Sequence, residues 1–393
     1  MNVEVDVFSY ENIKPSSPTP THFHYYRLSF LDQILPPVYA SFRYFYTKND
    51  AYSKISTDTT KSFSSVLKQS LYDVLTRYYP LAGRAKDKLS VDSNDEGVLF
   101  REAQVKCELS DIVINPNPAE FKKFLPCDID GMHNLTFVVQ VNYFTCGGIA
   151  IGACISHKIA DGTSFIMFMK TWAATSRGQT DVYPQFQASI LFPPTSNLSG
   201  FQPETSMIKE KLVLKRFVFS SATIEALKEK YTESSDVEGP LHPSRVEALL
   251  AFLWSRYVAA TQENCGHKKL NLVLFAVNLR TRIEERNGLV GNLRAAIRKI
   301  NNEYVKKLQD HTQHLDFVKG ANEKVLKQDT DPFNFTSLCR FPIYEMSFGW
   351  GNPMWIGRVS LPFKNVVFVG TKSGDGIEAW VNLKEEDMLP QPP

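Results

Sequence analysis

The chain has 393 residues, of which 43% are hydrophobic and 22% are charged; this ordinary composition excludes disordered, collagen-like and low-complexity proteins. The 44 Lys and Arg residues nearly balance the 42 Asp and Glu residues, so no overall field favours nucleic acid or a membrane surface. No apolar run approaches the ~18 residues of a membrane span, and the N-terminus carries acids where a signal peptide has basic and apolar stretches. We therefore expect a folded cytoplasmic protein with neither nucleic-acid nor membrane partners.

The six cysteines are scattered along the chain without a CxxC pair or a close group of Cys and His residues. They are Cys107, Cys127, Cys146, Cys154, Cys265 and Cys339. This spacing argues against a disulfide framework and against a zinc site. We expect reduced thiols that pack as small apolar side chains, and no metal.

Two kinds of periodicity define the first half of the chain. Apolar residues at spacings of three and four predict an amphipathic helix over residues 63–79, which Pro80 ends. From Leu135 onward, two β-rich runs separated by the glycine-containing residues 145–148 predict a hairpin. The first half therefore mixes helix and sheet.

The second strand of this hairpin leads directly into a polar turn. His157 follows the strand, Asp161 and Gly162 close the turn, and residues 163–174 have the apolar spacing of a helix. A polar turn between two apolar elements is a place where functional residues concentrate.

Residues 192–206 are rich in Pro and Ser and lack apolar periodicity, which predicts a linker. Two domains of similar size follow, residues 1–191 and residues 207–393. Both halves mix strands and helices, so the predicted fold class is α+β.

The second half begins with a strand and continues with two helices and a buried strand. Ser244 and Glu247 form a capping box before the second helix. The predicted elements are a strand over 212–219, a helix over 221–231, a helix over 246–254 and a strand over 269–280 that ends in Asn278 and Arg280.

The strongest local motif is HKIADG at residues 157–162, in which an aspartate follows a histidine at the fourth position. Among eight histidines only His157 has this partner. Such a spacing also arises by chance, and Asp161 could simply cap the following helix. A histidine at a strand end is nevertheless a suitable general base near neutral pH, with an ordinary pKa of about 6.5.

Other catalytic signatures are absent from the sequence. It contains no GxSxG elbow, no GxxxxGK[ST] phosphate loop and no GxGxxG after a strand. Cys154 and Ser156 precede His157, but neighbouring strand residues point to opposite faces and Cys154 is expected to pack. The segment SFGWGNP at residues 347–353 places two glycines around a tryptophan, a pattern more typical of a structural turn.

HKIADG and SFGWG together resemble the paired HxxxD and DFGWG motifs of the plant BAHD acyl-CoA-dependent acyltransferases. Further similar stretches run along the chain: PSSPTP at 15–20, LDQ at 31–33, YPLAGR at 79–84, VNLR at 277–280 and SGDGIEAW at 373–380. The resemblance therefore covers the whole protein. Within the family it is strongest to alkaloid O-acetyltransferases.

The resemblance implies an α/β sandwich fold, with two chloramphenicol-acetyltransferase-like domains and an interdomain channel for acyl-CoA and a small-molecule alcohol acceptor. It implies that a monomer transfers acetyl from acetyl-CoA to a hydroxyl of an alkaloid or other specialised metabolite. It assigns His157 as general base and pairs Asp161 with Arg280. Gly349, Trp350 and Gly351 would shape the CoA side.

Four further residues are candidates for contacts with the reactants. Lys372 and Ser373 at the SGDG turn, together with Arg340, are candidates for CoA binding, because the phosphates need local charge. Solvated surface charge is the alternative for each of these basic residues. Thr336 is a candidate contact for the oxyanion.

Three departures from the family pattern leave an alternative open. Ser347 replaces an aspartate, and Leu338 occupies a position that is commonly tryptophan. Residues 291–292 lead directly into a helical segment where relatives have a strand, and the stretch between residues 126 and 135 is short. The alternative is a non-catalytic paralogue that binds a ligand or a protein.

Overall fold

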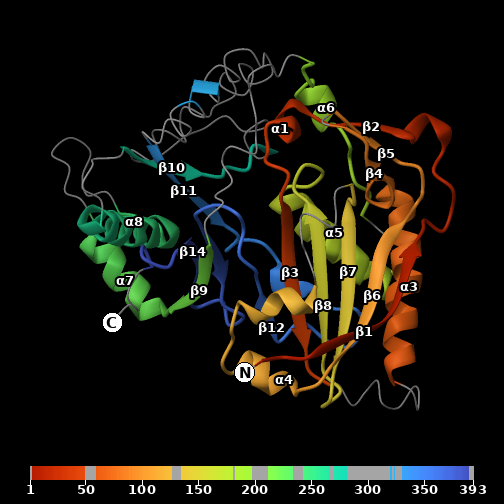
Figure 1. Ribbon diagram of the computed structural model, residues 1–393, viewed down its shortest axis with the longest axis horizontal. Helices are drawn as coiled ribbons and strands as arrows, with labels where there is room; N and C mark the ends of the chain where they lie inside the picture. The colour runs from red at the N-terminus through yellow and green to blue at the C-terminus, as the bar shows by residue number, and fades with distance from the viewer. Residues whose placement is uncertain are drawn as a thin grey trace. The chain divides into compact units, whose positions relative to one another are not determined.

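The computed structural model (Figure 1) describes most of the chain and divides it into two compact units. The described residues are 2–48, 59–87, 89–125, 134–179, 182–196, 211–232, 242–264, 270–280, 319–320, 323 and 330–388. Unit 1 comprises Met1–Ser196 and Phe341–Val359, and unit 2 comprises Asn197–Arg340 and Ser360–Pro393. Each unit is described by itself.

Unit 1 is built on a six-stranded sheet with the order β1-β6-β7-β8-β3-β12. The strands are β1 (Val5–Ile13), β6 (Val98–Val105), β7 (Phe137–Phe144), β8 (Ile149–Ser156), β3 (Tyr39–Tyr46) and β12 (Trp355–Gly357). Only β6 and β7 run parallel; the other neighbours are antiparallel. A small second sheet joins β2 (Tyr25–Arg27), β5 (Ser90–Asp92) and β4 (Arg84–Ala85).

Helices cover the main sheet of unit 1. The long helices are α3 (Thr59–Arg77) and α5 (Gly162–Thr175), which pack against each other, and α5 lies behind the strands in Figure 1. The short elements are η1 (Thr21–Phe23), α1 (Phe30–Gln33), η2 (Tyr79–Ala82), α4 (Leu109–Val113), η3 (Glu120–Phe124), α6 (Ala188–Leu191) and η6 (Ile343–Glu345). Every residue of β7 and β8 is buried, which explains their continuous apolar runs.

The two faces of the sheet pack against different elements. Phe42 on β3 contacts Phe165 of α5, with ring centroids 5.5 Å apart, and we call this the α5 face. Phe45, three residues further along β3, points to the opposite face, where its ring centroid lies 6.2 Å from that of Phe121 on η3. We call this side the η3 face.

The SFGWG segment belongs to unit 1, whereas the sequence analysis assigned it to the second half. The reason is strand pairing over a long sequence separation: β12 is antiparallel to β3, and the Tyr46 hydroxyl donates to Met346 O, 300 residues away, at 2.7 Å. Phe348 completes the attachment, with its ring 4.9 Å from that of Trp172 on α5.

Unit 2 has a five-stranded sheet with the order β10-β11-β13-β14-β9. Its strands are β9 (Leu212–Phe219), β10 (Leu270–Phe275), β11 (Thr330–Ser337), β13 (Asn365–Gly370) and β14 (Ile377–Lys384), and its helices are α7 (Ser221–Lys230) and α8 (Arg245–Asn264). Strands β10, β11 and β13 are parallel, and β14 is antiparallel to both β13 and β9. Apolar side chains from α7, α8 and the sheet form one core.

Most predicted elements are confirmed. The helix near 63–79, the β7–β8 hairpin, the strand–turn–helix unit and the mixed α+β class are all present. Glu247 accepts from Ser244 N at 2.7 Å, and Ser244 Oγ accepts from Glu247 N at 3.3 Å, so the capping box exists. Gly147 in the hairpin turn has φ +81°, a conformation that favours glycine.

One strand prediction is wrong in its burial. β10 ends at Phe275 and, among the described strands, lies at the edge of the unit 2 sheet, where it pairs with β11. Leu274 is consequently 41% exposed. The expected linker end, the segment between 126 and 135 and the helical segment after residue 292 fall wholly or mostly outside the described residues.

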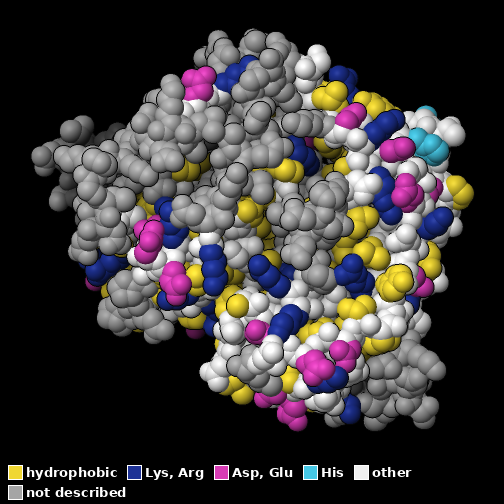
Figure 2. Space-filling view, in the orientation of Figure 1, with side chains coloured by type: hydrophobic (Ala, Val, Ile, Leu, Met, Phe, Trp, Pro, Cys, Tyr) yellow, Lys and Arg dark blue, Asp and Glu magenta, His cyan; other side chains and the backbone are white. Residues whose placement is uncertain are grey.

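The described surface carries charges of both signs. On the face shown in Figure 2, Lys and Arg side chains are interspersed with Asp and Glu side chains. Within the described part of the chain, no helix combines the length and apolarity needed to span a membrane.

Candidate active site

The HKIADG turn connects β8 to α5 as the sequence predicts. The backbone N–H of His157 donates to Val38 O at 2.9 Å, which extends the β3–β8 pairing by one step. Asp161 caps α5, because its Oδ1 accepts from the Ser164 N–H at 2.8 Å. The capping interpretation of Asp161 is therefore confirmed, and it fixes the loop that carries His157.

The imidazole of His157 is only partly exposed, and its Nδ1 is buried without a hydrogen bond to any described residue. Burial lowers the pKa of His157 below its ordinary value. The positive charge of Arg358 acts in the same direction on this pKa, whereas Asp161 opposes it. His157 is therefore neutral near pH 7, the form that can accept a proton.

An acidic side chain of the LDQ motif lies close to this turn. Burial, helped by the charge of Asp161, raises the pKa of Asp32 to about 6, against the hydrogen bonds that its carboxylate accepts from Ser29. Lys158 donates to Gln33 O at 3.5 Å. The sequence analysis did not connect LDQ with HKIADG, because 125 residues separate these partners.

Two buried residues that the sequence analysis missed lie on the same face of the sheet as His157. Arg358 is 8% exposed and lies over the Phe42 ring, 5.0 Å from its centroid. The Tyr44 hydroxyl is buried and has no hydrogen-bond partner among the described residues. The available signal was an arginine inside the apolar run MWIGRVSLPF at residues 354–363.

The predicted residues of unit 2 lie on strand ends and turns. Arg280 is exposed, and its N–H donates to Asn278 Oδ1 at 3.1 Å; the Asp161–Arg280 ion pair stays a prediction. Thr336 lies on β11 opposite Val367 of β13. The three CoA candidates Arg340, Lys372 and Ser373 are all exposed.

The SGDG turn joins β13 to β14 and is internally hydrogen-bonded. Ser373 Oγ donates to the Asp375 carboxylate, and Thr371 Oγ1 donates to the same oxygen at 3.1 Å. Arg245 of α8 donates to the Asp375 carbonyl at 2.5 Å. Ser373 therefore orders the turn, while Lys372 remains exposed beside it.

The glycine–tryptophan motif has a structural core. Trp350 is 3% exposed, and its ring lies 4.8 Å from Phe63 of α3. Gly349 and Gly351 are exposed and have φ +111° and φ +104°, which explains the two glycines. Any contact of this segment with CoA would involve its backbone, because the indole is in the core.

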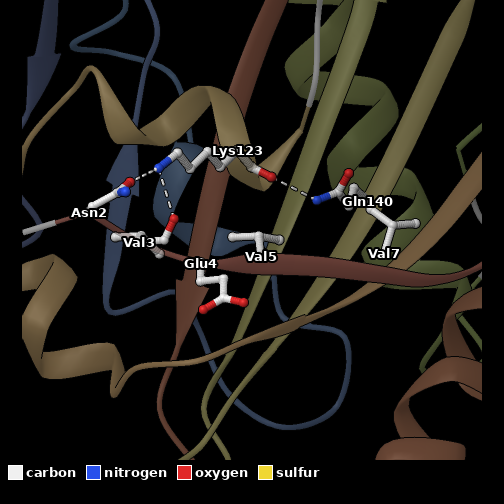
Figure 3. Close-up of a pocket in the computed structure, with 7 residues that line it drawn as sticks. All are labelled: Asn2, Val3, Glu4, Val5, Val7, Lys123 and Gln140. Atoms are coloured by element: carbon white, nitrogen blue, oxygen red, sulfur yellow. Dashed lines mark hydrogen bonds between the residues drawn. The ribbon is translucent and has the colours of Figure 1, made fainter.

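A cavity of about 540 Å³ beside the N-terminus carries no predicted site residue (Figure 3). Its polar groups already bond to one another: Lys123 Nζ donates to Asn2 Oδ1 at 2.6 Å and Val3 O at 2.8 Å, and Gln140 donates to Lys123 O at 3.0 Å. Among the described residues, no group of three or more His, Cys, Asp and Glu side chains could hold a metal ion.

Comparison with known proteins connects this geometry to a family. The Transferase family model matches residues 3–298 and 290–390. Stemmadenine O-acetyltransferase of Catharanthus roseus is 35% identical, covering 99% of this chain and 96% of the relative. Limonoid 7-O-acetyltransferase of Citrus sinensis is 34% identical, covering 98% of this chain and 95% of the relative.

A solved structure agrees over the whole chain. The crystal structure of vinorine synthase superposes with a TM-score of 0.79 at 33% identity, covering 98% of this chain and 97% of the other. The match to the family model breaks and resumes within residues 290–298, where the sequence analysis expects a missing strand. The chain belongs to the Transferase family of BAHD acyl-CoA-dependent acyltransferases, with the two-domain α+β fold of these enzymes, and it is an acyltransferase.

Proposed function

We propose that the protein transfers an acetyl group from acetyl-CoA to a hydroxyl of an alkaloid or another specialised metabolite, with His157 as the general base. The observation that carries this proposal is a partly exposed imidazole whose pKa burial holds below its ordinary value. Such a base is neutral at physiological pH and ready to accept the acceptor's proton.

The reaction needs no covalent enzyme intermediate. His157 removes the hydroxyl proton while the acceptor oxygen attacks the thioester carbonyl, and the carbonyl electron pair moves onto oxygen. When this pair returns, the C–S bond breaks, and the CoA sulfur takes the proton from His157. Cys154 is 0% exposed within an apolar cluster, which supports direct attack over a cysteine nucleophile.

The choice of acceptor class rests on the relatives. They are named for acetylation of stemmadenine and of limonoids, and these acceptors are large alcohols. We propose that Asp161 and Arg280 form an ion pair that supports the catalytic loop, and that Lys372 and Arg340 contact CoA phosphates. Both assignments need side-chain variants to test them.

The direct test is thiol release from acetyl-CoA in the presence of hydroxylated alkaloids and limonoids. We expect steady release that depends on the acceptor and yields the acetyl ester by mass spectrometry. Release without any acceptor would instead indicate a thioesterase. Retained binding of alcohols without release of CoA would favour the ligand-binding alternative and would overturn the proposal.

A further inference from the structure

Three polar groups on the α5 face of unit 1 are unsatisfied among the described residues. The Tyr44 hydroxyl and His157 Nδ1 are buried without a hydrogen bond. Arg358 is 8% exposed, makes no hydrogen bond or ion pair with a described residue, and interacts electrostatically with both Tyr44 and His157. Buried polar groups are normally paired, so three together require a reason.

The register of the strands places these groups on one face of the sheet. Ile356 lies opposite Tyr44 and Gly357 lies opposite Arg43, so Arg358 continues the pairing next to Phe42. Residues opposite each other in antiparallel strands point to the same face. Phe42, Tyr44 and Arg358 therefore share the α5 face, and the alternation along β8 brings His157 to that face as well. His157 bonds to Val38, four residues along β3 from Phe42 and six from Tyr44, so Arg358 lies between Tyr44 and His157 along this face.

The charge of Arg358 is costly where it lies. Burial, together with the like charge of Arg43, lowers the pKa of Arg358 to about 10, so Arg358 still carries its proton at neutral pH. A buried cation without a counter-ion among the described residues has lost hydration that no ion pair replaces, which is unfavourable. The cation–π contact with Phe42 holds the guanidinium over the ring but leaves its N–H donors for a ligand.

We propose that Arg358, with Tyr44 on the side away from His157, forms a subsite on the α5 face that binds a negatively charged oxygen of the reacting substrates. This inference rests on the proposed acyl transfer, which offers two sources for the oxygen. One is the oxyanion that forms on the thioester carbonyl when the acceptor attacks. The other is a carboxylate carried by the acceptor or by the acyl group.

A titration of His157 tests the subsite without requiring turnover. The imidazole resonances of the full-length wild type and of Arg358→Met are followed by NMR against pH, with and without sodium acetate as the anionic probe. The other charges near the turn are Asp161, Lys158 and Asp32. We expect the pKa of His157 to rise in Arg358→Met, because a neighbouring cation is removed.

Acetate should raise the pKa of His157 in the wild type and lose this effect in Arg358→Met. Arg256→Met is the matched control, because Arg256 also stacks on a phenylalanine, Phe252, at 5.5 Å but is exposed in unit 2. An unchanged His157 pKa and an unchanged acetate response in Arg358→Met would overturn the proposal.

Kinetics with an acceptor from the alcohol panel distinguish the two sources. A fall of kcat by ~10²-fold to 10³-fold at unchanged KM identifies the oxyanion, because that is the usual effect of losing one oxyanion donor. A raised KM for one substrate at unchanged kcat identifies a carboxylate of that substrate. Tyr44→Phe should show the same pattern at smaller size.

Folding and catalysis are separated by two further measurements. Arg358→Met should keep or raise the Tm, because it removes an unpaired buried charge; a lower Tm with unchanged kinetics would mean a structural role and would refute the subsite. If Arg358→Met does not fold, Arg358→Lys and Tyr44→Phe carry the test. Normal turnover in His157→Ala would defeat the proposed function alone, whereas the titration still reports on the subsite.

Discussion

Two buried arginines lie on opposite faces of the sheet at β3, and they differ in their hydrogen bonding. On the η3 face, Arg43 is 0% exposed and donates to Phe121 O at 3.0 Å and to Leu125 O at 2.9 Å. On the α5 face, Arg358 has an aromatic ring beneath it and no acceptor among the described residues. The first arginine attaches η3 to the sheet, and the second has donors to offer a ligand.

The same contrast extends to β7, which β8 separates from β3 in the sheet. Gln140 donates to Lys123 O at 3.0 Å and Asn142 to Phe124 O at 2.9 Å, so both bind the backbone of η3. On the other face His157 Nδ1 and the Tyr44 hydroxyl lack such partners among the described residues. Among the described residues, Arg43, Gln140 and Asn142 each donate to backbone carbonyls on the η3 face, although Gln140 Oε1 accepts no hydrogen bond. Donors bound to the backbone of η3 therefore distinguish the structural face from the candidate site.

The largest effect is expected on the α5 face. His157→Ala should lower turnover by ~10²-fold to 10⁴-fold, the usual contribution of a positioned general base. Initial rates of thiol release from acetyl-CoA measure it, with circular dichroism as the check that the fold is intact. A variant that keeps near-normal turnover would remove His157 from the mechanism.

On the η3 face the same kind of change should act on stability. Arg43→Met should lower the free energy of unfolding by at least about 2 kcal/mol, because each buried carbonyl left unsatisfied costs about 1 to 3 kcal/mol. Urea denaturation measures the loss, and Arg358→Met is the matched control without such a loss. Equal destabilisation by both substitutions would contradict the contrast between the faces.

Local patterns explain why the first part of the site could be predicted from the sequence. His157 and Asp161 belong to one strand–turn–helix unit whose apolar periodicity changes at the turn. The spacing of apolar residues also predicted α3, α5, α8 and the β7–β8 hairpin, because each of these elements buries a continuous stripe or run of apolar side chains. Prediction succeeded where neighbours in sequence are neighbours in space.

The remaining residues depend on contacts between distant segments. Arg358 meets Phe42 only because β12 pairs with β3, and Asp32 reaches the HKIADG turn only through the tertiary fold. No periodicity encodes such a register. The exposed edge position of β10 was missed for the same reason, since an apolar run does not state how many neighbours a strand will have.

The pH dependence of kcat/KM tests the electrostatic environment of His157 on the α5 face. Because the pKa of His157 is lowered, the neutral imidazole persists to lower pH, and the acid limb of kcat/KM should fall below pH 6.5. Rates between pH 5 and 8 locate the limb. Asp32, with its pKa raised to about 6, titrates in the same range, so Asp32→Asn serves as the control. Disappearance of the limb in that variant would assign it to Asp32.

The smallest effect concerns Ser347, which stands where the family has aspartate. Arg177 donates to the Ser347 carbonyl and to Ala173 O at 2.8 Å, and its side chain is exposed. An exposed guanidinium is solvated, so the absence of a carboxylate at position 347 costs little. α5 separates this contact from Asp161 by roughly 20 Å, from 1.5 Å per helical residue.

Ser347→Asp should therefore form a surface ion pair with Arg177 and raise the free energy of unfolding by only ~0.2 to 1 kcal/mol. The gain should shrink as salt is added, because exposed pairs are screened. Ser347→Ala is the control and should change neither stability nor turnover appreciably, since the backbone carbonyl that Arg177 binds remains. Loss of turnover in Ser347→Ala, with stability and CoA binding intact, would instead place the serine hydroxyl in the reaction and refute its structural role.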